Sequence, residues 1–548
     1  MHAAPPEPSL PQDPAALRAM LLKVLAERDA AVQGRDAERD AATRERERVE
    51  RERDDALAQN ERLLALLAKL RRMQFGRKSE RLTEDQFQFA FEEIAATLAA
   101  DQAEAERRSP QRRAKGTEER RTTRGKLPAH LPRVEVVIEP VESTCPCCRG
   151  AMVVIGADIA ERLDVIPAQY QVLVTKRPKL ACRACAGVVM QAPAPERLIT
   201  GGLPSEATVA HVLVSRYADH LPLYRQSQIL ARQGIEIGRD TLASWIGVAA
   251  NELKPVVARL REILLGSARL FADETTLPVL DPGRGRTKKG YAWAIARDDR
   301  PWGGSDPPAV VFRYAPGRGQ EHARQLLGDY GGLLQCDGYA AYKSVSASPA
   351  GGITLAFCWA HVRREFYDLA RGGAAPIATE ALQRIAVLYG IESDIRGQPP
   401  NVRRAARQAR SKPLVGALFT WFETQLGRLA GGAPTAAKIR YALNHREGLE
   451  RFLDDGRLDM DNNVVERTIR PLVLSRKNAL FASGDDGGER WAAIASLVET
   501  CKLNGANPQQ YFTDVLTRLV NGWPQSRIDE LMPWKWASAK KDERQTAA

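Results

Sequence analysis

The stretch Leu270-Phe271-Ala272-Asp273 places a carboxylate directly after an apolar run, and the chain repeats this arrangement at Leu333-Leu334-Gln335-Cys336-Asp337. Short apolar runs of this kind are typical of buried strands. A third acid, Glu466, lies in Asp461-Asn462-Asn463-Val464-Val465-Glu466-Arg467, which is typical of the start of a helix. Two strands and a helix would therefore bring three carboxylates together. Hard divalent cations prefer oxygen ligands, and two of them about 4 Å apart can clamp the attacking and leaving oxygens of a phosphodiester.

The elements around the two aspartates have a definite order. Three strands, a helix and two further strands are predicted at 270–273, 290–296, 309–314, 320–327, 333–337 and 353–358. This is the order of a ribonuclease-H-like fold, a mixed sheet flanked by helices. The first and fourth strands are neighbours in that fold, so Asp273 and Asp337 would lie side by side. Close carboxylates repel one another unless cations neutralise them, which favours a metal site.

The predicted helix that carries Glu466 has Asp459 or Asp461 as its N-cap. Its polar face, with spacings of three or four residues, consists of Asn462, Asn463, Glu466 and Arg470. The candidates for phosphate contacts on this helix are Arg467, Arg470, Arg476 and Lys477. A plain surface helix is the alternative, and Val464 and Val465 argue against it because they would anchor the opposite face in a core.

The segment Cys358-Trp359-Ala360-His361-Val362-Arg363-Arg364 follows the last predicted strand. His361 is a candidate acid/base group or phosphate contact, and the alternative is a hydrogen-bonded core histidine. Arg363 and Arg364, beside it, are candidates for contacts with nucleic acid.

Length and charge indicate a multidomain protein with an anionic partner. A chain of 548 residues exceeds a single hydrophobic core. Its 80 Lys and Arg against 68 Asp and Glu give a net charge of +12. This excess suits nucleic acid, although a soluble basic protein with no such partner has the same balance. No apolar run approaches the roughly 18 residues of a membrane span, and the first residues lack a signal-peptide pattern, so we expect a cytoplasmic protein.

The core would be interrupted by a helical insertion. Residues 265–371 and 452–498 are expected to form the core, and residues 372–451 between them are mainly helical in pattern. The basic residues of the insertion are Arg403, Arg404, Arg407, Arg410 and Lys412. They suit a DNA-facing surface or a solvated helix face equally well.

The N-terminal part begins with a Pro-rich segment, 1–14, that we expect to be disordered. Residues 15–100 have a helical pattern. The spacing of three and four that is typical of a coiled-coil seam occurs at Leu63, Leu66, Leu70 and Met73. A coiled coil would make the protein a homo-oligomer, and the alternative is a charged helix that packs on its own body. Residues 101–130 are interpreted as a basic linker.

Residues 131–200 contain short β-like runs, at 134–138, 153–155 and 171–175, together with two CxxC pairs. The pairs consist of Cys145 with Cys148 and Cys182 with Cys185. Two such pairs on β-hairpins can supply four thiolates to a structural Zn²⁺. Four reduced core thiols are the alternative, and Cys147 would be surplus to the zinc site.

Residues 201–264 have three helix-like stretches, at 205–218, 224–233 and 239–250, and the last two are joined by a short turn with glycines. This arrangement is typical of a helix-turn-helix. Arg239, Thr241 and Ser244 would then begin the recognition helix and contact bases. An ordinary three-helix bundle has similar turns and is the alternative. Residues 499–548 form a C-terminal segment.

Taken together, these segments resemble the DDE transposases of the insertion sequence 66 group of bacterial mobile elements. The resemblance covers nearly everything after about Leu63. Its most specific segments are the CPCC and CRAC pairs, Ala272-Asp273-Glu274-Thr275, Cys336-Asp337-Gly338-Tyr339, Trp359-Ala360-His361-Val362-Arg363-Arg364, Asp461-Asn462-Asn463-Val464-Val465-Glu466-Arg467 and Gly487-Gly488-Glu489-Arg490.

The resemblance implies a zipper-like N-terminus, a zinc-binding DNA-recognition domain and a catalytic domain in which Asp273, Asp337 and Glu466 hold two Mg²⁺ or Mn²⁺ ions. It implies a transposase that binds the terminal inverted repeats of its element, cuts there and joins the ends to target DNA. Such a protein would work on double-stranded DNA at the bacterial nucleoid, in some elements with small accessory proteins. A catalytically silent DNA-binding regulator and a structure-specific nuclease or resolvase are the alternatives.

Overall fold

The computed structural model describes residues 13–75, 99, 102, 107–123, 131–135, 137, 147–149, 162–163, 169–181, 189–281, 284, 286–347, 352–371, 373, 375–479 and 482–546. The chain divides into two compact units, Met1–Leu173 and Val174–Ala548. Among the described residues, no helix combines the length and apolar character that a bilayer span requires.

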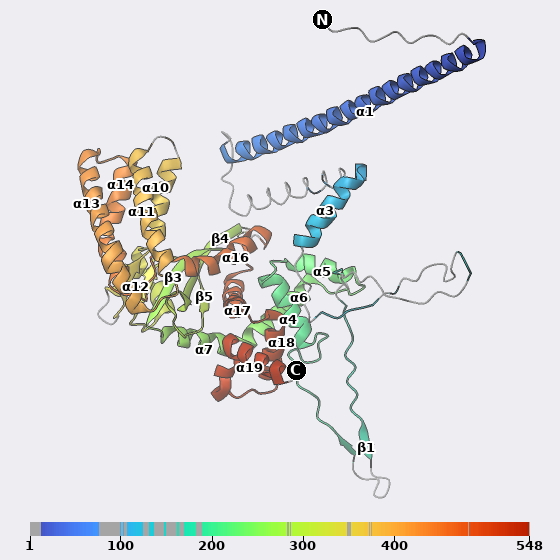
Figure 1. The fold of residues 1–548 in the computed structure, drawn as a ribbon. Coiled ribbons are helices and arrows are strands. Elements are labelled where there is room, and N and C mark those ends of the chain that lie inside the picture. The colour runs from blue at the N-terminus through green and yellow to red at the C-terminus, as the bar shows by residue number, and fades with distance from the viewer. Residues whose placement is uncertain are drawn as a thin grey trace. The chain divides into compact units, whose positions relative to one another are not determined.

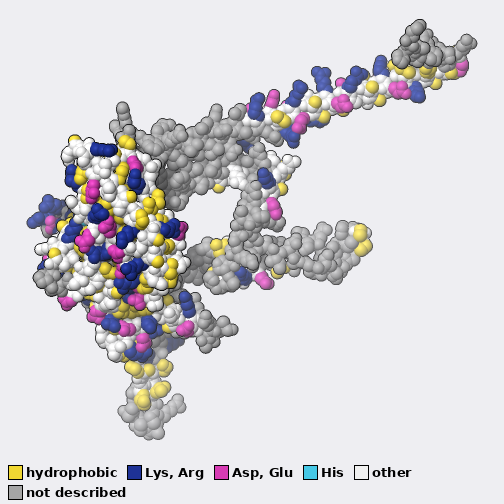
Figure 2. Space-filling view, turned by 60° about the vertical axis from the view of Figure 1, so that its left-hand side comes forward, with side chains coloured by type: hydrophobic (Ala, Val, Ile, Leu, Met, Phe, Trp, Pro, Cys, Tyr) yellow, Lys and Arg dark blue, Asp and Glu magenta, His cyan; other side chains and the backbone are white. Residues whose placement is uncertain are grey.

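The first unit is dominated by one long helix, α1, which covers Pro14–Phe75 (Figure 1). Its 62 residues correspond to a length of about 93 Å at about 1.5 Å per residue. Basic and acidic side chains are interspersed along its exposed part (Figure 2), as expected for a helix stabilised by i,i+4 pairs. The predicted coiled-coil seam lies within α1, and the oligomer stays a prediction. A shorter helix, α3 at Pro110–Thr123, lies inside the predicted linker.

Two short strands, β1 at Lys179–Ala181 and β2 at Val189–Gln191, pair antiparallel on either side of the second CxxC pair. The strand expected at 171–175 is wrong, because these residues are described and form no strand. Val172 is 87% exposed, so the run has neither a partner strand nor a core to pack against. Strand propensity alone does not make a strand without such packing. In the run at 134–138 the described residues are likewise not in a strand, and 153–155 lie outside the described residues.

The second unit contains a five-stranded mixed sheet in the order β5-β4-β3-β6-β7. The strands are β3 at Arg269–Asp281, β4 at Arg286–Arg297, β5 at Ala309–Ala315, β6 at Leu333–Cys336 and β7 at Thr354–Phe357. β3 pairs antiparallel with β4 and parallel with β6, and β6 pairs parallel with β7. The predicted adjacency of the first and fourth strands is therefore confirmed.

The first strand is longer than its apolar run suggested. β3 continues to Asp281, eight residues past Asp273, because its pairing with β4 extends that far. Its parallel pairing with β6 stops at Phe271. Asp273 therefore lies where the parallel pairing ends, while the strand itself goes on as a long antiparallel ribbon with β4.

Helices cover both faces of this sheet. On one face α16 (Asn463–Ala479) and α17 (Asp485–Leu503) pack against alternate residues such as Ala292 and Ala294 (Figure 1). Trp293 on the opposite face is also fully buried. Burial on both faces explains why these strands read as nearly continuous apolar runs. The short helices beside the sheet are α8 at Gln320–Leu327 and α9 at Ala340–Ser346.

The predicted three-helix stretch is confirmed, with a fourth helix after it. The helices are α4 at Glu206–Tyr217, α5 at Leu223–Ala231, α6 at Arg239–Glu252 and α7 at Lys254–Leu265. The C-terminal segment forms α18 at Pro508–Val520 and α19 at Pro533–Thr546. It joins the helical domain, since the Gln509 side chain donates to the carbonyl of Ala207 at 3.0 Å.

The insertion is helical, as predicted. Its helices are α11 at Pro376–Asp394, α12 at Pro400–Ala406, α13 at Lys412–Arg428, α14 at Pro434–Asn444 and α15 at Arg446–Glu450. They share an aromatic core with α10 (Trp359–Arg371), in which the rings of Phe366 and Phe422 stack 5.3 Å apart. The expectation of an exposed basic face is wrong for Arg403 and Arg407, which are 2% and 0% exposed. Both pair with Glu392 inside the insertion, a partner that a charge pattern does not reveal.

Candidate active site

The two aspartates come together through the register of β3 and β6. Phe271 pairs with Gln335 in the parallel ladder, and two further residues along each strand bring Asp273 level with Asp337. Alternation along a strand puts Asp273 on the same face as Phe271. That face packs against Val465 of α16, the helix that carries Glu466. The three acids thus reach one region from segments almost 200 residues apart in sequence.

The start of α16 is fixed to the sheet by Asn462. Its side-chain nitrogen donates to the carbonyl of Ala272 at 3.0 Å, and its backbone N–H donates to Cys358 Sγ at 3.1 Å. Asp461 accepts from the N–H of Asn463 at 3.1 Å, but the predicted N-cap is wrong: α16 begins at Asn463, and the carbonyl of Asn462 accepts the first intrahelical bond, from Glu466 at 3.3 Å, so Asn462 is the cap. Asn462 is therefore a buried residue that positions the acid-bearing helix.

Asp459, the other candidate cap, has a different role. Its carboxylate pairs with Arg269 of β3 at 3.1 Å and with Arg403 of the insertion at 2.9 Å. It therefore links the sheet, the insertion and the segment that leads into α16.

The carboxylates act on one another electrostatically. Burial raises the pKa of the Asp273 carboxyl well above its ordinary value, and the charge of Glu274 adds to the rise. The charges of Asp337 and Glu466 raise the same pKa further. Only the backbone N–H of Glu274, which donates to Asp273 at 2.8 Å, opposes the shift. A buried group that feels three other carboxylates is a site where cations stabilise the ionised form.

Glu274 is a fourth acid, and sequence analysis gave it no role. It points to the other face of the sheet, where Arg318 donates to it at 2.5 and 2.8 Å and the Tyr342 hydroxyl donates at 2.7 Å. Because its charge is compensated by Arg318, we assign it to holding the strand beside Asp273. The acidic pair Asp273-Glu274 was visible in the sequence, but the partner from residue 318 was not.

Asp337 sits on a turn that requires glycine. Its carboxylate accepts from the N–H of Tyr339 at 2.9 Å, and Gly338 between them has φ +84°. A Cβ at Gly338 would lie 2.7 Å from the ring of His445, and L side chains rarely adopt that φ.

Replacing Gly338 by alanine is expected to lower the free energy of unfolding by about 1–3 kcal/mol, because the backbone would be strained and the ring of His445 displaced. Gly331→Ala is the matched control, since an added Cβ there meets no atom within 4 Å. It should change stability by less than about 0.5 kcal/mol. Denaturant unfolding of the two variants measures the difference, and equal stabilities would contradict the strain.

His361 lies beside Glu466. Its Nδ1 is 3.8 Å from Glu466 Oε1, and together with Cys358 Sγ the donor atoms lie within 4.8 Å of one another. A thiolate metal ligand is nevertheless unfavourable here. Burial raises the pKa of the Cys358 thiol to about 12, and its sulfur already accepts a backbone hydrogen bond. We therefore interpret Cys358 as a structural contact of α16, and His361 and Glu466 as the groups that face the site.

Three polar atoms at this site are buried and have no hydrogen-bond partner among the described residues: Glu466 Oε1, His361 Nδ1 and Asn462 Oδ1. Leaving such atoms without a partner costs free energy. A hard divalent cation near Glu466, Asp273 and Asp337 would give Glu466 Oε1 a partner, because such cations prefer oxygen ligands. The oxygens of Asp273, Asp337 and Glu466 therefore suit Mg²⁺ or Mn²⁺ in ligand type, although the donor atoms that lie within 4.8 Å of one another among the described residues are those of Cys358, His361 and Glu466.

The other predicted contact residues occupy several places. Arg364 lies at the site, 3.8 Å from Glu466 and 64% exposed. The remaining exposed residues are Arg239, Thr241 and Ser244 in the first two turns of α6, Arg363 on α10, and Asn463, Arg470 and Lys477 on α16. Arg467 lines a separate cleft of about 690 Å³ with Arg396.

Arg476 lies away from the acids, where its guanidinium donates to the carbonyl of Thr276 at 2.6 Å. Among the predicted zinc ligands, Cys145, Cys182 and Cys185 lie outside the described residues, and Cys148 is exposed. The zinc ligands therefore stay a prediction.

Family models match four parts of the chain. The model described as Transposase IS66 family matches residues 201–490, and the IS66 C-terminal element matches residues 496–534. The zinc-finger binding domain of transposase IS66 matches residues 142–186, and Transposase C of IS166 homeodomain matches residues 62–136. Together these models cover the end of α1, the cysteine pairs, the helical domain and the sheet with its acids.

The chain is also similar to proteins of Sinorhizobium fredii. The uncharacterized protein y4qI is 44% identical over 542 residues, which span 97% of this chain and 98% of that protein. The uncharacterized protein y4jD is 41% identical over 86% of this chain and 94% of that protein. With one family model matching more than half of its length, this chain belongs to the IS66 transposase family and has the zinc-finger and DNA-binding parts of an insertion-sequence transposase.

Proposed function

We propose that this transposase binds the terminal inverted repeats of a bacterial insertion sequence, cuts the DNA there and joins the freed 3′ ends to target DNA. The observation that supports the proposal is that the half-buried carboxyl of Asp273, level with Asp337 across the parallel strands, has its pKa raised by the charges of Asp337 and Glu466. The strand order β5-β4-β3-β6-β7 supports a ribonuclease-H-like catalytic core, interrupted by the helices between residues 372 and 451.

The three acids would hold two divalent cations, Mg²⁺ or Mn²⁺. When bound, these ions would supply charge stabilisation to the attacking and leaving oxygens of a phosphodiester. The chain's own residues set the geometry. Asn462 holds the acid-bearing helix against β3, and Arg318 fixes the strand through Glu274. Arg364, exposed beside Glu466, would contact a phosphate and hold the strand in line for attack.

DNA recognition would fall to separate parts of the chain. Arg239, Thr241 and Ser244 are exposed at the start of α6, where a recognition helix contacts bases. The four paired cysteines would hold a structural Zn²⁺. We further propose that α1 joins copies of the protein through its coiled-coil seam, that small proteins of the element assist it, and that it works at the nucleoid in the cytoplasm.

The test uses duplexes made from the DNA that flanks the reading frame. The full-length protein should nick these ends to leave a 3′-hydroxyl and join them to a plasmid with Mg²⁺ or Mn²⁺, and EDTA should abolish both reactions. Shuffled duplexes of equal length are the control.

Two other outcomes decide between the alternatives. Specific binding of the ends without cleavage in any divalent cation would indicate a DNA-binding regulator. Cleavage that ignores the end sequence and never joins strands would indicate a nuclease or resolvase.

A further inference from the structure

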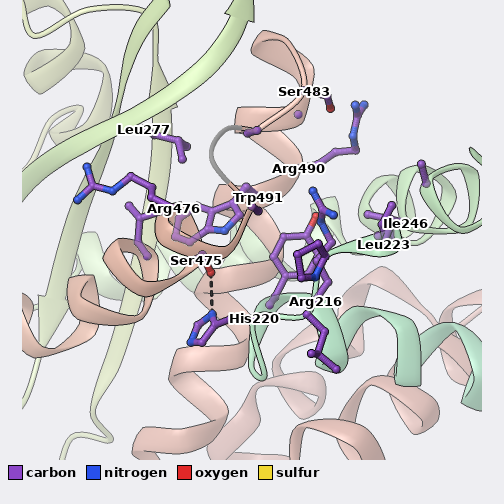
Figure 3. A pocket seen from close by; sticks show the side chains of 18 residues that line it. Arg216, His220, Leu223, Ile246, Leu277, Ser475, Arg476, Ser483, Arg490 and Trp491 are labelled. Carbon is purple, nitrogen blue, oxygen red and sulfur yellow. Dashed lines mark hydrogen bonds between the residues drawn. The ribbon is translucent and has the colours of Figure 1, made fainter. Parts of the chain in front are cut away.

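A pocket of about 190 Å³ lies between the helical domain and the sheet, away from the three acids (Figure 3). Its walls come from the end of α4, from α6, from the C-terminal half of α16 and from the start of α17. This volume is below roughly 300 Å³, the lower end of sites for drug-sized ligands, so it suits a single ring system.

The chemistry of the walls indicates an aromatic, anionic occupant. The cationic and aromatic residues of the lining are Arg216, Arg476, Arg490, His220, Tyr217 and Trp491, and none of the described lining residues is acidic. The guanidinium of Arg476 donates to Thr276, whereas that of Arg216 lies 5.7 Å from the ring centroid of Tyr217. Burial raises the pKa of Tyr217 and the guanidinium groups of Arg216 and Arg490 oppose the rise, so both cations lie near its hydroxyl.

The wall of the pocket at His220 has a backbone conformation that a non-glycine residue seldom adopts. His220 adopts φ 58° although it is not glycine, and its ring forms a 2.7 Å hydrogen bond with Ser475 of α16 (Figure 3). Backbone strain of this kind persists only where the surroundings enforce it. Arg490 and Gly487 belong to the segment Gly487-Gly488-Glu489-Arg490, one of those that carry the family resemblance, and the three-acid site makes no use of it.

The pocket is lined by two elements to which the proposed function gives contacts with DNA. Ala243 and Ile246 of α6, the proposed recognition helix, line one side, and Arg476 of α16 lines another. Glu466 precedes Arg476 by ten residues on the same helix, a distance of about 15 Å. A DNA strand advances about 3.4 Å per nucleotide, so a strand that reaches the acids would pass the pocket roughly four or five nucleotides away.

We propose that this pocket holds one unstacked base of the DNA substrate, with Trp491 as the stacking surface and Arg216 and Arg490 at the adjoining phosphates. This inference rests on the proposed function, because it assumes that DNA ends reach the three acids. Taking a base out of the duplex would fix the register of the strand relative to the site of cleavage.

The test measures how tightly full-length wild-type and variant proteins bind end duplexes. The duplexes are either intact or carry one abasic site within six nucleotides of the cut. On intact DNA, Trp491→Ala should weaken binding roughly 5- to 150-fold, the value of one base stacked on an aromatic ring. At one abasic position, four or five nucleotides from the cut, this loss should disappear. Trp523→Ala is the matched control, since Trp523 lies between Arg518 and Arg527 outside the pocket.

Trp491 also packs against Phe312, with ring centroids 5.5 Å apart, so replacing Trp491 can disturb folding. A second measurement therefore uses the wild-type protein alone. A mismatch at the held position should tighten binding of the wild-type protein several-fold, since the base is then easier to unpair. Ends that bind and are cut with no position-specific effect of mismatch or abasic site would overturn this inference and leave the proposed function standing. Failure to bind the ends at all would overturn both.

Discussion

Replacing Asp273 by asparagine is expected to lower strand cleavage at least about 10³-fold while binding of the ends stays within about twofold, because divalent cations contribute several kcal/mol to the transition state. The amide has the shape of the carboxylate but cannot balance cation charge. Asp273 lies where β3 leaves its partner β6, and its pKa responds to the other acids of the site. Single-turnover cleavage and a gel-shift titration on the same end duplex measure the two quantities.

The same substitution should not harm the fold. The folded-state pKa of Asp273 is raised, so its ionised form lowers stability at pH values above the unfolded pKa, and the neutral amide removes that repulsion. Without added metal, the variant should unfold at the same temperature as the wild type or higher. Asp281→Asn, at the far end of the same strand, is the control and should cut at the normal rate. Normal cleavage by Asp273→Asn would refute the catalytic assignment.

The sequence predicted the elements that bear the acids because their signals are local. An apolar run that stops at an acid indicates a buried strand with a polar end, and β6 follows this pattern at Asp337. The sequence also indicated the neighbouring strands and the helix of Glu466. Residues 171–175 have the residue types of a strand but, in the described part of the chain, no neighbouring strand to pair with, and the expected strand does not form there.

Features that depend on distant partners could not be predicted in this way. Glu274 is explained by Arg318 and Tyr342, which lie 44 and 68 residues further along the chain. The pocket beside Trp491 combines side chains from residues 216 to 491, and no local pattern marks it. Basic residues of the insertion seemed alike in sequence, yet Arg407 is buried and Arg410 is exposed. Which charges are buried depends on how the helices pack.

Arg407→Ala is expected to lower the free energy of unfolding by about 3–5 kcal/mol, the range for breaking a buried ion pair on one side. Its fully buried guanidinium donates to Glu392 at 2.6 and 2.8 Å and to the carbonyls of Phe452, Asp455 and Leu458 at 2.8–3.0 Å. Alanine would leave Glu392 and three carbonyls without this donor. Denaturant unfolding, followed by circular dichroism, measures the loss.

Arg410→Ala is the matched control, because Arg410 pairs with Asp394 in the same segment but both side chains are about half exposed. Exposed pairs of this kind contribute about 0–1 kcal/mol. The loss of unfolding free energy in Arg407→Lys should lie between the losses in Arg407→Ala and Arg410→Ala, since an ammonium group cannot reach all the acceptors of Arg407 in one geometry. Replacing Arg407 and Glu392 together by methionine should recover part of the stability, because the charge of Glu392 is then removed with its partner and Arg403 keeps its pair with Asp459, while the three carbonyls still lack their donor.

The effect of Arg407 should extend to catalysis. The carbonyls it holds belong to the segment just before Asp459, and that carboxylate ties Arg269 of β3 to Arg403 of the insertion. The insertion therefore helps to set where α16 begins and where Glu466 lies. Arg407→Ala should lower cleavage even at temperatures where the variant is folded, and Arg410→Ala should not. A destabilised Arg407→Ala that cuts as fast as the wild type when folded would show that the insertion stabilises the fold without positioning the acid.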